Sequence, residues 1–480
     1  MKEKFGYLFK NTGYLVIGNF SSKILVFLLV PLYTSVLSTA EYGTYDLAFT
    51  TIQMLVPILS LNILDGVMRF SFDTGKKERQ YTFSIAIKCM LLACVIFSAG
   101  AIIAKILFSI NILEQYLLEI ILFFTLYIFS QFTVQFAKGL DDVKGISISG
   151  ILGTSTVILF NILFLLVWKF GLRGFFWANI FSFGIQGFFL FVHSKAYSYY
   201  VLPKEIGKAG REYGKEILIY CWPLVFNTLS WYINGAADRY VVTLINGIET
   251  NGIYSVAYKI PAILNAVQTI FIQAWQLSAI KEYETSDSEK FYKKTYQSVQ
   301  MTMIILCSAL IMGTRIIARL LFSSDFYMAW KYVPTLLTYI IFNTLAGTVG
   351  GIFAAAKDSK AFSISAITGA TINILLNIAL VYFWGAEGAA IATVISSIVI
   401  WYMRMRFARK YVELSLNHRF YFFEFALLFI QAALMTVIEE RWGYYFQLVL
   451  FCVIVIMNIK EFRDISGKKI SFGRGNENDQ

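Results

Sequence analysis

The sequence predicts an all-α polytopic membrane protein with about 14 transmembrane helices. Its 480 residues are 58% hydrophobic and only 15% charged, and its mean hydropathy is +0.63. Soluble chains average about 45–50% apolar and about 25% charged residues. The apolar residues also form repeated runs of about 20, the length with which a helix crosses a hydrocarbon core about 30 Å thick. A transmembrane β-barrel would show alternating segments of about 10 residues instead.

Fourteen apolar runs are candidate spans, and charged or turn-forming residues separate them. They are 14–35, 47–70, 83–103, 116–136, 147–167, 174–191, 217–244, 253–280, 296–313, 333–356, 362–383, 388–403, 420–438 and 444–459. The last two are the least secure, because deleting both together leaves the orientation of every other span unchanged. The polar residues 460–480 are expected to form a disordered cytoplasmic tail.

The basic residues of the loops define the orientation. With the amino terminus in the cytoplasm, 29 of the 41 Lys and Arg residues fall in inside segments and 7 in outside loops. Cytoplasmic loops of membrane proteins carry such an excess of positive charge. The net charge of +11 therefore reflects membrane topology, and we expect no nucleic-acid partner. Both termini are expected in the cytoplasm.

The chain repeats itself with an offset near 210 residues. The segment Glu41–Ala48 matches Thr250–Ala257, and both are expected to be outside links between spans. The segment 142–149 matches 358–365 and Asn161 matches Asn377, while the outside turn 171–174 matches 385–388. After six spans the chain is again on the side of the membrane where it started. The two six-span halves therefore have the same orientation, and the repeat is parallel. Parallel repeats in transporters are related by an axis along the membrane normal, with the substrate site between the halves.

The repeat divides the chain into five segments. They are an N-terminal six-helix lobe (14–193), a cytoplasmic linker (194–216), a C-terminal six-helix lobe (217–407), an extra helix pair (420–459) and the polar tail (460–480). No outside loop is long enough for a soluble catalytic domain, so we expect no enzyme.

Basic residues inside the spans are the main candidates for a binding site, because a charge at the bilayer centre costs about 2.5–3.5 kcal/mol on insertion scales. Lys23 is the deepest, and Asn19 lies one turn before it on the same helical face. Arg239 and Lys259 lie near the outer ends of consecutive spans. Arg69 lies at the inner end of the second span, one turn after Asp65.

Polar residues share these helices with the basic ones. Asp238, Asn234 and Asn227 form a stripe at spacings of 4 and 7, and Gln268 lies further along the eighth span. They are candidates for the cavity wall or for a coupling ion. An ion pair of Asp238 with Arg239 or Lys259 that only joins two helices is the alternative, and local pairing or snorkelling is the alternative for Arg69. Several buried cations favour an anionic ligand, and a pyrophosphate suits Arg and Lys well.

The sequence lacks the patterns of a metal or cofactor site. The five cysteines lie in or beside apolar runs without metal-type spacing, and the two histidines lie singly at span ends. We expect no metal and no cofactor. Pro31, Pro57, Pro223, Pro261 and Pro334 all fall within the predicted spans, which indicates helix kinks.

The region from Asp238-Arg239-Tyr-Val-Val to Thr250-Asn-Gly-Ile-Tyr-Ser-Val-Ala-Tyr-Lys259 resembles the seventh and eighth spans of Wzx-type polysaccharide-biosynthesis flippases. These belong to the multidrug/oligosaccharidyl-lipid/polysaccharide (MOP) exporter superfamily, together with multidrug-and-toxin extruders (MATE) and lipid II flippases. The six-plus-six repeat extends the resemblance over 14–403. It implies a V-shaped MATE-like arrangement of two lobes around a basic cavity, with Lys23, Arg239 and Lys259 in its wall.

The resemblance also implies a function. The protein would sit in a bacterial cytoplasmic (inner) membrane and flip undecaprenyl-pyrophosphate-linked oligosaccharide repeat units to the outer face by alternating access. Such units serve O-antigen, lipopolysaccharide or capsule synthesis. Expected partners are this lipid-linked substrate, membrane lipids, a polysaccharide polymerase and a chain-length regulator, with the chain itself a monomer. The glycan and the energy source, whether proton, sodium ion or membrane potential, stay open, and Asp46, Asp65 and Asp238 are candidates to bind a coupling ion.

Three alternatives remain from the sequence. A lipid II flippase also has fourteen spans. A cation-coupled multidrug extruder typically has acidic residues in its first span, where this chain has Lys23. A membrane-embedded polysaccharide polymerase or ligase generally needs a larger outside loop than the longest one here, about 314–332.

Overall fold

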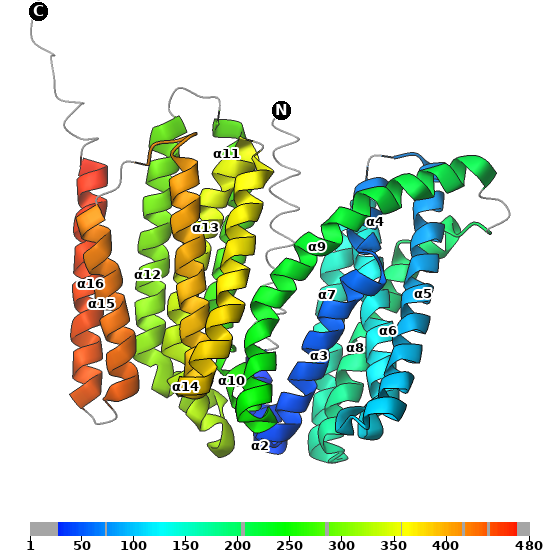
Figure 1. The fold of residues 1–480 in the computed structure, drawn as a ribbon, viewed down its shortest axis with the longest axis horizontal. Coiled ribbons are helices and arrows are strands. Elements are labelled where there is room, and N and C mark those ends of the chain that lie inside the picture. The colour runs from blue at the N-terminus through cyan, green and yellow to red at the C-terminus, as the bar shows by residue number, and fades with distance from the viewer. Residues whose placement is uncertain are drawn as a thin grey trace, which may run out of the picture. The chain divides into compact units, whose positions relative to one another are not determined.

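The computed structural model describes residues 27–72, 74–202, 207–283, 288–356, 358–414, 418–438 and 442–467. Within these ranges the chain is helical, and the first predicted span lies mostly outside them. Figure 1 shows the helices, which form two compact units. The first contains residues up to Ser255 together with 321–326, and the second contains 256–320 and 327 onward.

The first unit is built from long helices and five short ones. Its elements are α2 (Val30–Val36), α3 (Thr39–Leu59), α4 (Ile63–Ser71), α5 (Lys76–Phe108), α6 (Asn111–Gly139), α7 (Val143–Asn161) with the π-helix η1 (Ile162–Val167), α8 (Gly171–His193), the 3-10 helix η2 (Ala196–Tyr199), α9 (Gly207–Asn246) and most of α10 (Ile248–Ala257). Helix α8 packs against α6 and α7, and α9 packs against α3, α4 and α5. The observed units therefore divide the chain after α9, later than the predicted linker 194–216, and the predicted lobe boundaries stay a prediction.

The second unit holds the remaining elements. They are α11 (Pro261–Glu282), α12 (Ser288–Leu321), the 3-10 helix η3 (Ser324–Lys331), α13 (Val333–Ala355), α14 (Ser359–Ala408), α15 (His418–Val437) and α16 (Trp442–Gly467). Helix α13 is the centre of this unit, since it packs against α11, α14 and α15 and most of its residues are buried. Residues 460–467 continue α16, so the start of the predicted polar tail is helical.

The membrane-spanning character is evident from helix length and from the side chains that face outward. Within the described residues, nine helices are long and apolar enough to span a membrane, or ten if the bent pair α3–α4 counts as one span. Large apolar side chains are exposed along α5, among them Ile103, Ile106 and Phe108. Exposed apolar surface of this extent marks contact with lipid or a partner. The all-α polytopic fold is confirmed, and this count is consistent with the fourteen predicted spans.

Two predicted spans are interrupted in the structure. The span 47–70 is broken after Leu59, and α3 and α4 meet at an angle of 60°. Leu61 and Asn62 adopt left-handed backbone angles at this break, four and five residues after Pro57. The span 253–280 is likewise interrupted, because α10 ends at Ala257 and α11 begins at Pro261. The spans 362–383 and 388–403 lie on either side of the backbone break at Gly385 in α14, as predicted.

The prolines explain part of this pattern. Pro31, Pro261 and Pro334 occupy the first or second position of α2, α11 and α13. Proline is favoured there because the amide it lacks has no helical partner anyway. The predicted kinks at these three positions are therefore helix starts, whereas Pro57 and Pro223 lie inside α3 and α9.

The two segments that were expected to be outside links are helical. Glu41–Ala48 lies in the first turns of α3, and Thr250–Ala257 lies in α10. Helix α3 begins with a capping box, in which Ser38 Oγ accepts a bond from the Glu41 amide and the Glu41 carboxylate accepts one from the Ser38 amide. This Ser-x-x-Glu signature in the sequence already marks a helix start.

The internal repeat is visible as matching geometry at matched positions. Asp142 and Asp358 each cap the helix that follows, accepting bonds of 2.9 and 3.0 Å from the amides three residues on. Asn161 and Asn377 are both buried, and each donates to the carbonyl four residues earlier. The turn glycines Gly171 and Gly385 both have positive φ angles, of 56° and 60°. The repeat is therefore structural, and not a chance similarity of apolar runs.

Candidate functional site

The first turns of α3 place two sets of side chains on different faces. Tyr42 and Tyr45 are buried in an aromatic cluster with Phe175 of α8, and the Tyr45 and Phe175 ring centroids are 4.4 Å apart. Gly43 and Asp46, each one residue further on, lie on the helical face directed at α9 and α10. The aromatic cluster therefore orients α3 so that a carboxylate faces the neighbouring helices.

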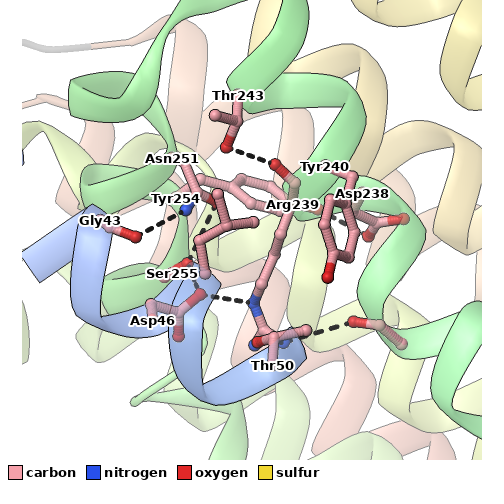
Figure 2. A network of polar contacts seen from close by, with 12 residues as sticks. Gly43, Asp46, Thr50, Asp238, Arg239, Tyr240, Thr243, Asn251, Tyr254 and Ser255 are labelled. Carbon is pink, nitrogen blue, oxygen red and sulfur yellow. Dashed lines mark hydrogen bonds and ion pairs between the residues drawn. The ribbon is translucent and has the colours of Figure 1, made fainter. Parts of the chain in front are cut away.

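Asp46 holds Arg239 of α9 in an ion pair (Figure 2). The Arg239 Nε to Asp46 Oδ2 distance is 3.0 Å, and the side chains are only 20% and 14% exposed. Arg239 Nη1 also lies 3.4 Å from Thr50 Oγ1, one turn after Asp46. A guanidinium at this depth is costly unless a carboxylate compensates its charge. Asp46 provides that compensation from another helix.

Helix α10 completes the network around Asp46. Ser255 Oγ donates to Asp46 Oδ2 at 2.6 Å, and Asn251 Nδ2 donates to the Gly43 carbonyl at 3.4 Å. Thr51 Oγ1 and the Tyr240 hydroxyl are 2.6 Å apart and join α3 to α9 a second time. Figure 2 shows these side chains converging from the three helices. The network therefore ties α3, α9 and α10 together around one guanidinium.

Two matched glycines of the repeat allow this contact. A Cβ on Gly43 would meet the Ile248 carbonyl oxygen and would lie 3.0 Å from the Gly252 nitrogen. A Cβ on Gly252 would meet the Thr39 carbonyl oxygen. Backbone atoms cannot move aside as a flexible side chain does, so only glycine permits this crossing. The crossing places Asp46 beside Ser255, which are themselves equivalent positions of the two repeats.

Asp238 has a different partner from the one considered in the sequence. Its side chain is 1% exposed, and its Oδ2 accepts a 3.0 Å bond from the hydroxyl of the fully buried Tyr254. Arg239 forms an ion pair with Asp46, which is 193 positions earlier in the chain. Asp238 thus links α9 to α10 beside the ion pair.

Asp65 and Arg69 lie on α4, away from this network. Asp65 accepts bonds from Asn62 Nδ2 at 2.9 Å and from Gln135 Nε2 at 3.3 Å, whereas Arg69 is exposed. Within the described residues, no ion pair joins Asp65 to Arg69. Asp65 therefore links the segment between α3 and α4 to helix α6.

The other predicted site residues are distributed over both units. Asn227 and Asn234 lie on α9, and their side chains are outside the description, as are Asn19 and Lys23 altogether. Lys259 lies in the turn 258–260 between α10 and α11. Gln268 of α11 is 8% exposed, and its Oε1 has no hydrogen-bond partner among the described residues. Lys259 and Gln268 belong to the second unit and the others to the first.

Sequence reasoning named Arg239 but missed Thr50 and Ser255, and it considered Asp46 only as an ion-coupling candidate. The repeat carried the missing signal, because it aligns Gly43 with Gly252 and Asp46 with Ser255. Within the described residues, no three or more His, Cys, Asp or Glu side chains are grouped closely enough to hold a metal ion.

The fold defines the class of this protein, a multi-spanning membrane protein with the architecture of MOP-superfamily transporters. A lipid II flippase, MurJ, in an inward closed conformation matches with a TM-score of 0.71 and 15% identity, covering 94% of this chain and 98% of that one. A MATE-family multidrug resistance transporter in an inward-facing conformation matches with a TM-score of 0.67 and 16% identity, over 81% and 94%. A MOP transporter from Pyrococcus furiosus, described as having a binding pocket of reversed polarity, matches at 0.57 and 15%, over 83% and 94%.

The chain belongs to the polysaccharide biosynthesis protein family. The family model matches residues 8–276, more than half of the sequence and the part that holds α2 to α10 and most of α11. No curated protein sequence matches the chain significantly. The family description thus indicates polysaccharide biosynthesis, and the solved structures show that the fold is the one found in MOP-superfamily transporters.

Proposed function

We propose that this protein flips undecaprenyl-pyrophosphate-linked oligosaccharide repeat units from the cytoplasmic to the outer face of a bacterial inner membrane. The observation that carries the proposal is the Arg239–Asp46 ion pair in a chain of the polysaccharide biosynthesis family. A partly buried guanidinium whose charge is compensated by one exchangeable carboxylate is suited to an anionic ligand.

The proposed role of the pair is charge exchange. A pyrophosphate carries more negative charge and more acceptor oxygens than one carboxylate, so it competes with Asp46 for Arg239. When the substrate is absent, Asp46 neutralises the guanidinium and prevents an unpaired charge in the membrane. When the substrate binds, Asp46 is released to Ser255, and the contact between α3, α9 and α10 loosens. This would couple substrate binding to alternating access between the halves of the repeat.

Lys23, Lys259 and Arg69 are proposed to contact the same anion during transport, with Asn19, Asn227, Asn234 and Gln268 available to the glycan. The basis is their chemistry and their positions in the predicted spans. A polysaccharide polymerase and a chain-length regulator are proposed to act on the product at the outer face.

A lipid II flippase is the second candidate. The specific observation in its favour is that the MurJ match covers 94% of this chain. Helices α15 and α16 together occupy 418–467, so a match that left them out could not extend that far. Both candidates share the polyprenyl-pyrophosphate and differ in the attached group, which a transport assay separates.

The experiment uses the purified full chain in proteoliposomes with fluorescent polyprenyl-pyrophosphate oligosaccharide in both leaflets. A membrane-impermeant quencher added outside removes half of the signal without transport and more when the probe crosses. We expect rapid crossing of the oligosaccharide probe and none of a polyprenyl alcohol that lacks the pyrophosphate. Faster crossing of lipid II would favour the second candidate, and crossing of neither would refute both.

Variants of the pair test the mechanism in the same assay. Arg239→Gln is expected to slow transport about 10- to 100-fold, because a hydrogen bond to a charged group contributes about 1.5–3 kcal/mol. Arg239→Lys keeps the charge and should retain part of the activity. The matched control is Arg173→Gln, which removes an arginine of α8 that is paired with Glu119 at 3.1 Å. Equal loss in both variants would show that Arg239 has no special role.

A further inference from the structure

Helices α12 and α15 of the second unit are joined by buried polar contacts at regular spacing. Gln300 Nε2 donates to Glu424 Oε2 (2.7 Å), Ser308 Oγ donates to Gln431 Oε1 (2.7 Å), and Arg315 Nη2 donates to the carbonyls of Met435 and Ile438 (2.7 and 2.6 Å). The order is the same along both helices, so they run parallel here. In Figure 1, α15 and α16 lie beside α12.

In two of the three contacts, other groups of the protein supply the hydrogen-bond partners. Ser308 and Gln431 bond reciprocally, because Gln431 Nε2 donates to the Ser308 carbonyl at 3.2 Å. Arg315 binds the carbonyl end of α15, where a cation is favoured, and its guanidinium lies 4.3 Å from the centre of the Trp330 ring. These contacts place charge and hydrogen-bonding groups opposite complementary partners.

The first contact is different, because the acid that it contains, Glu424, has only the neutral amides of Gln300 and Asn458 as donors. Glu424 and Gln300 are each 1% exposed. Glu424 Oε1 and Gln300 Oε1 are buried and have no hydrogen-bond partner among the described residues, whereas the nearby Tyr421 hydroxyl interacts with Gln297. Among the same residues, no ion pair neutralises Glu424. A buried carboxylate without compensation is strongly unfavourable.

These oxygens surround a cavity of about 20 Å³. Space of about 10–15 Å³ on this measure already accommodates one water molecule. Glu424, Gln300 and Tyr421 line the cavity together with Asn458 and Glu461 of α16, and Lys294 lies at its rim. The cavity therefore combines room for one small occupant with oxygen atoms that lack donors.

The side chains that line the cavity indicate which class of ligand it can bind. Carboxylate, amide and hydroxyl oxygens suit hard cations. A divalent ion would require more acidic ligands, and no group of three or more His, Cys, Asp or Glu residues occurs in the described parts of the chain. One buried carboxylate balances one positive charge. The volume admits one desolvated ion, and the carboxylate favours Na⁺ over the larger K⁺ because the shorter ion–oxygen distance strengthens the attraction.

We propose that a monovalent metal cation, Na⁺ by size, binds between Glu424, Gln300 and Tyr421 where α12 meets α15. The cation neutralises the carboxylate and bonds to the two oxygens that lack donors. It thereby strengthens the attachment of the α15–α16 pair to α12. This site is independent of the transported substrate and of the Arg239–Asp46 network.

Thermal unfolding of the purified full chain tests the site, with NaCl replaced by KCl or choline chloride at constant ionic strength. A ligand that binds only the folded state raises the melting temperature with its concentration. We expect the wild-type protein to melt higher in Na⁺ than in K⁺ or choline, with saturation. Glu424→Gln should abolish this difference and should be at least as stable as the wild type in choline, because the uncompensated charge is gone. A purely structural role for Glu424 would instead lower stability in every salt.

Controls separate this site from other occupants. Ser308→Ala removes a polar contact on the same helix pair and should keep the Na⁺ response. A Na⁺-independent wild-type protein, or a Glu424→Gln variant that keeps the response, would overturn the proposal. If Lys294→Gln destabilises the chain while Na⁺ has no effect, the lysine ammonium is the neutralising group, and the proposal is wrong. None of these outcomes depends on flipping activity.

Discussion

At the scale of single residues, the arrangement around Arg239 shows how a membrane protein carries a cation near the end of a span. Asp46 lies 3.0 Å away on another helix, and Ser255 donates to the same carboxylate oxygen. Removing one member of a buried pair costs about 3–5 kcal/mol, because the remaining charge is left uncompensated. Both side chains here keep some exposure, so the cost is smaller.

A double-mutant cycle measures the strength of this pair. Asp46→Asn and Arg239→Gln are each expected to destabilise the protein by about 1–3 kcal/mol, and the double variant by less than their sum. Thermal or denaturant unfolding in detergent provides the free energies. Additive effects would mean that the two side chains do not interact in solution.

Asp358 allows a prediction about acid stability, since it precedes α14 outside the spanning helices. The hydroxyl of Tyr411 donates to Asp358 Oδ2 at 2.7 Å and the Ala361 amide to Oδ1 at 3.0 Å. These bonds, that from Tyr411 first, lower the pKa of Asp358 below its usual value. A lowered folded-state pKa stabilises the protein above the unfolded pKa, and this contribution disappears as the pH falls through the folded value.

Tyr411→Phe should therefore reduce the melting temperature near neutral pH and have little effect once Asp358 is protonated in both states. Melting curves of the two proteins between neutral and strongly acidic pH check this. A difference that stays constant over the whole range would assign the effect to lost packing of the ring instead.

At the scale of elements, single residues determine where helices begin and where they cross. A hydropathy profile does not detect the effect of these residues. Three prolines begin helices, and a capping box starts α3 at Thr39. The crossing of α3 and α10 depends on Gly43 and Gly252, whose missing side chains let backbone atoms approach. Such a crossing holds the Asp46 and Ser255 side chains within hydrogen-bond distance.

Gly252→Ala is expected to destabilise the protein by about 1–3 kcal/mol, since overpacking against a rigid backbone forces the helices apart. The new Cβ would collide with the Thr39 carbonyl oxygen. Gly100→Ala is the matched control, because Gly100 lies in α5 with no atom within 4 Å of a Cβ placed there. Gly100→Ala should be neutral or stabilising by up to about 1 kcal/mol. Similar melting temperatures for both variants would contradict the close crossing.

At the scale of the whole molecule, the repeat accounts for the architecture. Matching helix caps at Asp142 and Asp358 and matching turns at Gly171 and Gly385 show two copies of one helical plan. Helices α15 and α16 are additional to that plan. Buried polar contacts from α12 attach this pair, which explains why the chain keeps polar residues such as Glu424 and Gln431 in an apolar helix.

The predicted topology has both termini in the cytoplasm and fourteen spans. Alkaline phosphatase, which is active only outside the cytoplasm, should be active when fused after residue 440 and inactive after residue 480. A green fluorescent protein fused at the same positions should give the opposite result. Activity of the phosphatase at both positions would mean that the last span does not exist, and activity only after residue 480 would reverse the orientation.

Much of the fold was predictable because it depends on local sequence properties. Apolar runs and loop charge predict spans and orientation from residues close together in the chain, and the offset repeat predicts matched halves. The breaks at 60–62 and 258–260 were not predicted, because hydropathy averages over a window and does not resolve a few residues of non-helical backbone. The site was predicted only in part: Arg239 was named, but its partners were not.

The sequence by itself determined that this is a many-spanning helical membrane protein, built from a parallel repeat, with cations inside its spans. Only the tertiary structure decided which groups compensate those charges. Asp46 meets Arg239, Gly43 meets Gly252, and Gln300 meets Glu424, although each pair is more than a hundred residues apart. The physical reason is that a charge in the membrane must be compensated in space, and packing selects the partner from any helix that lies alongside.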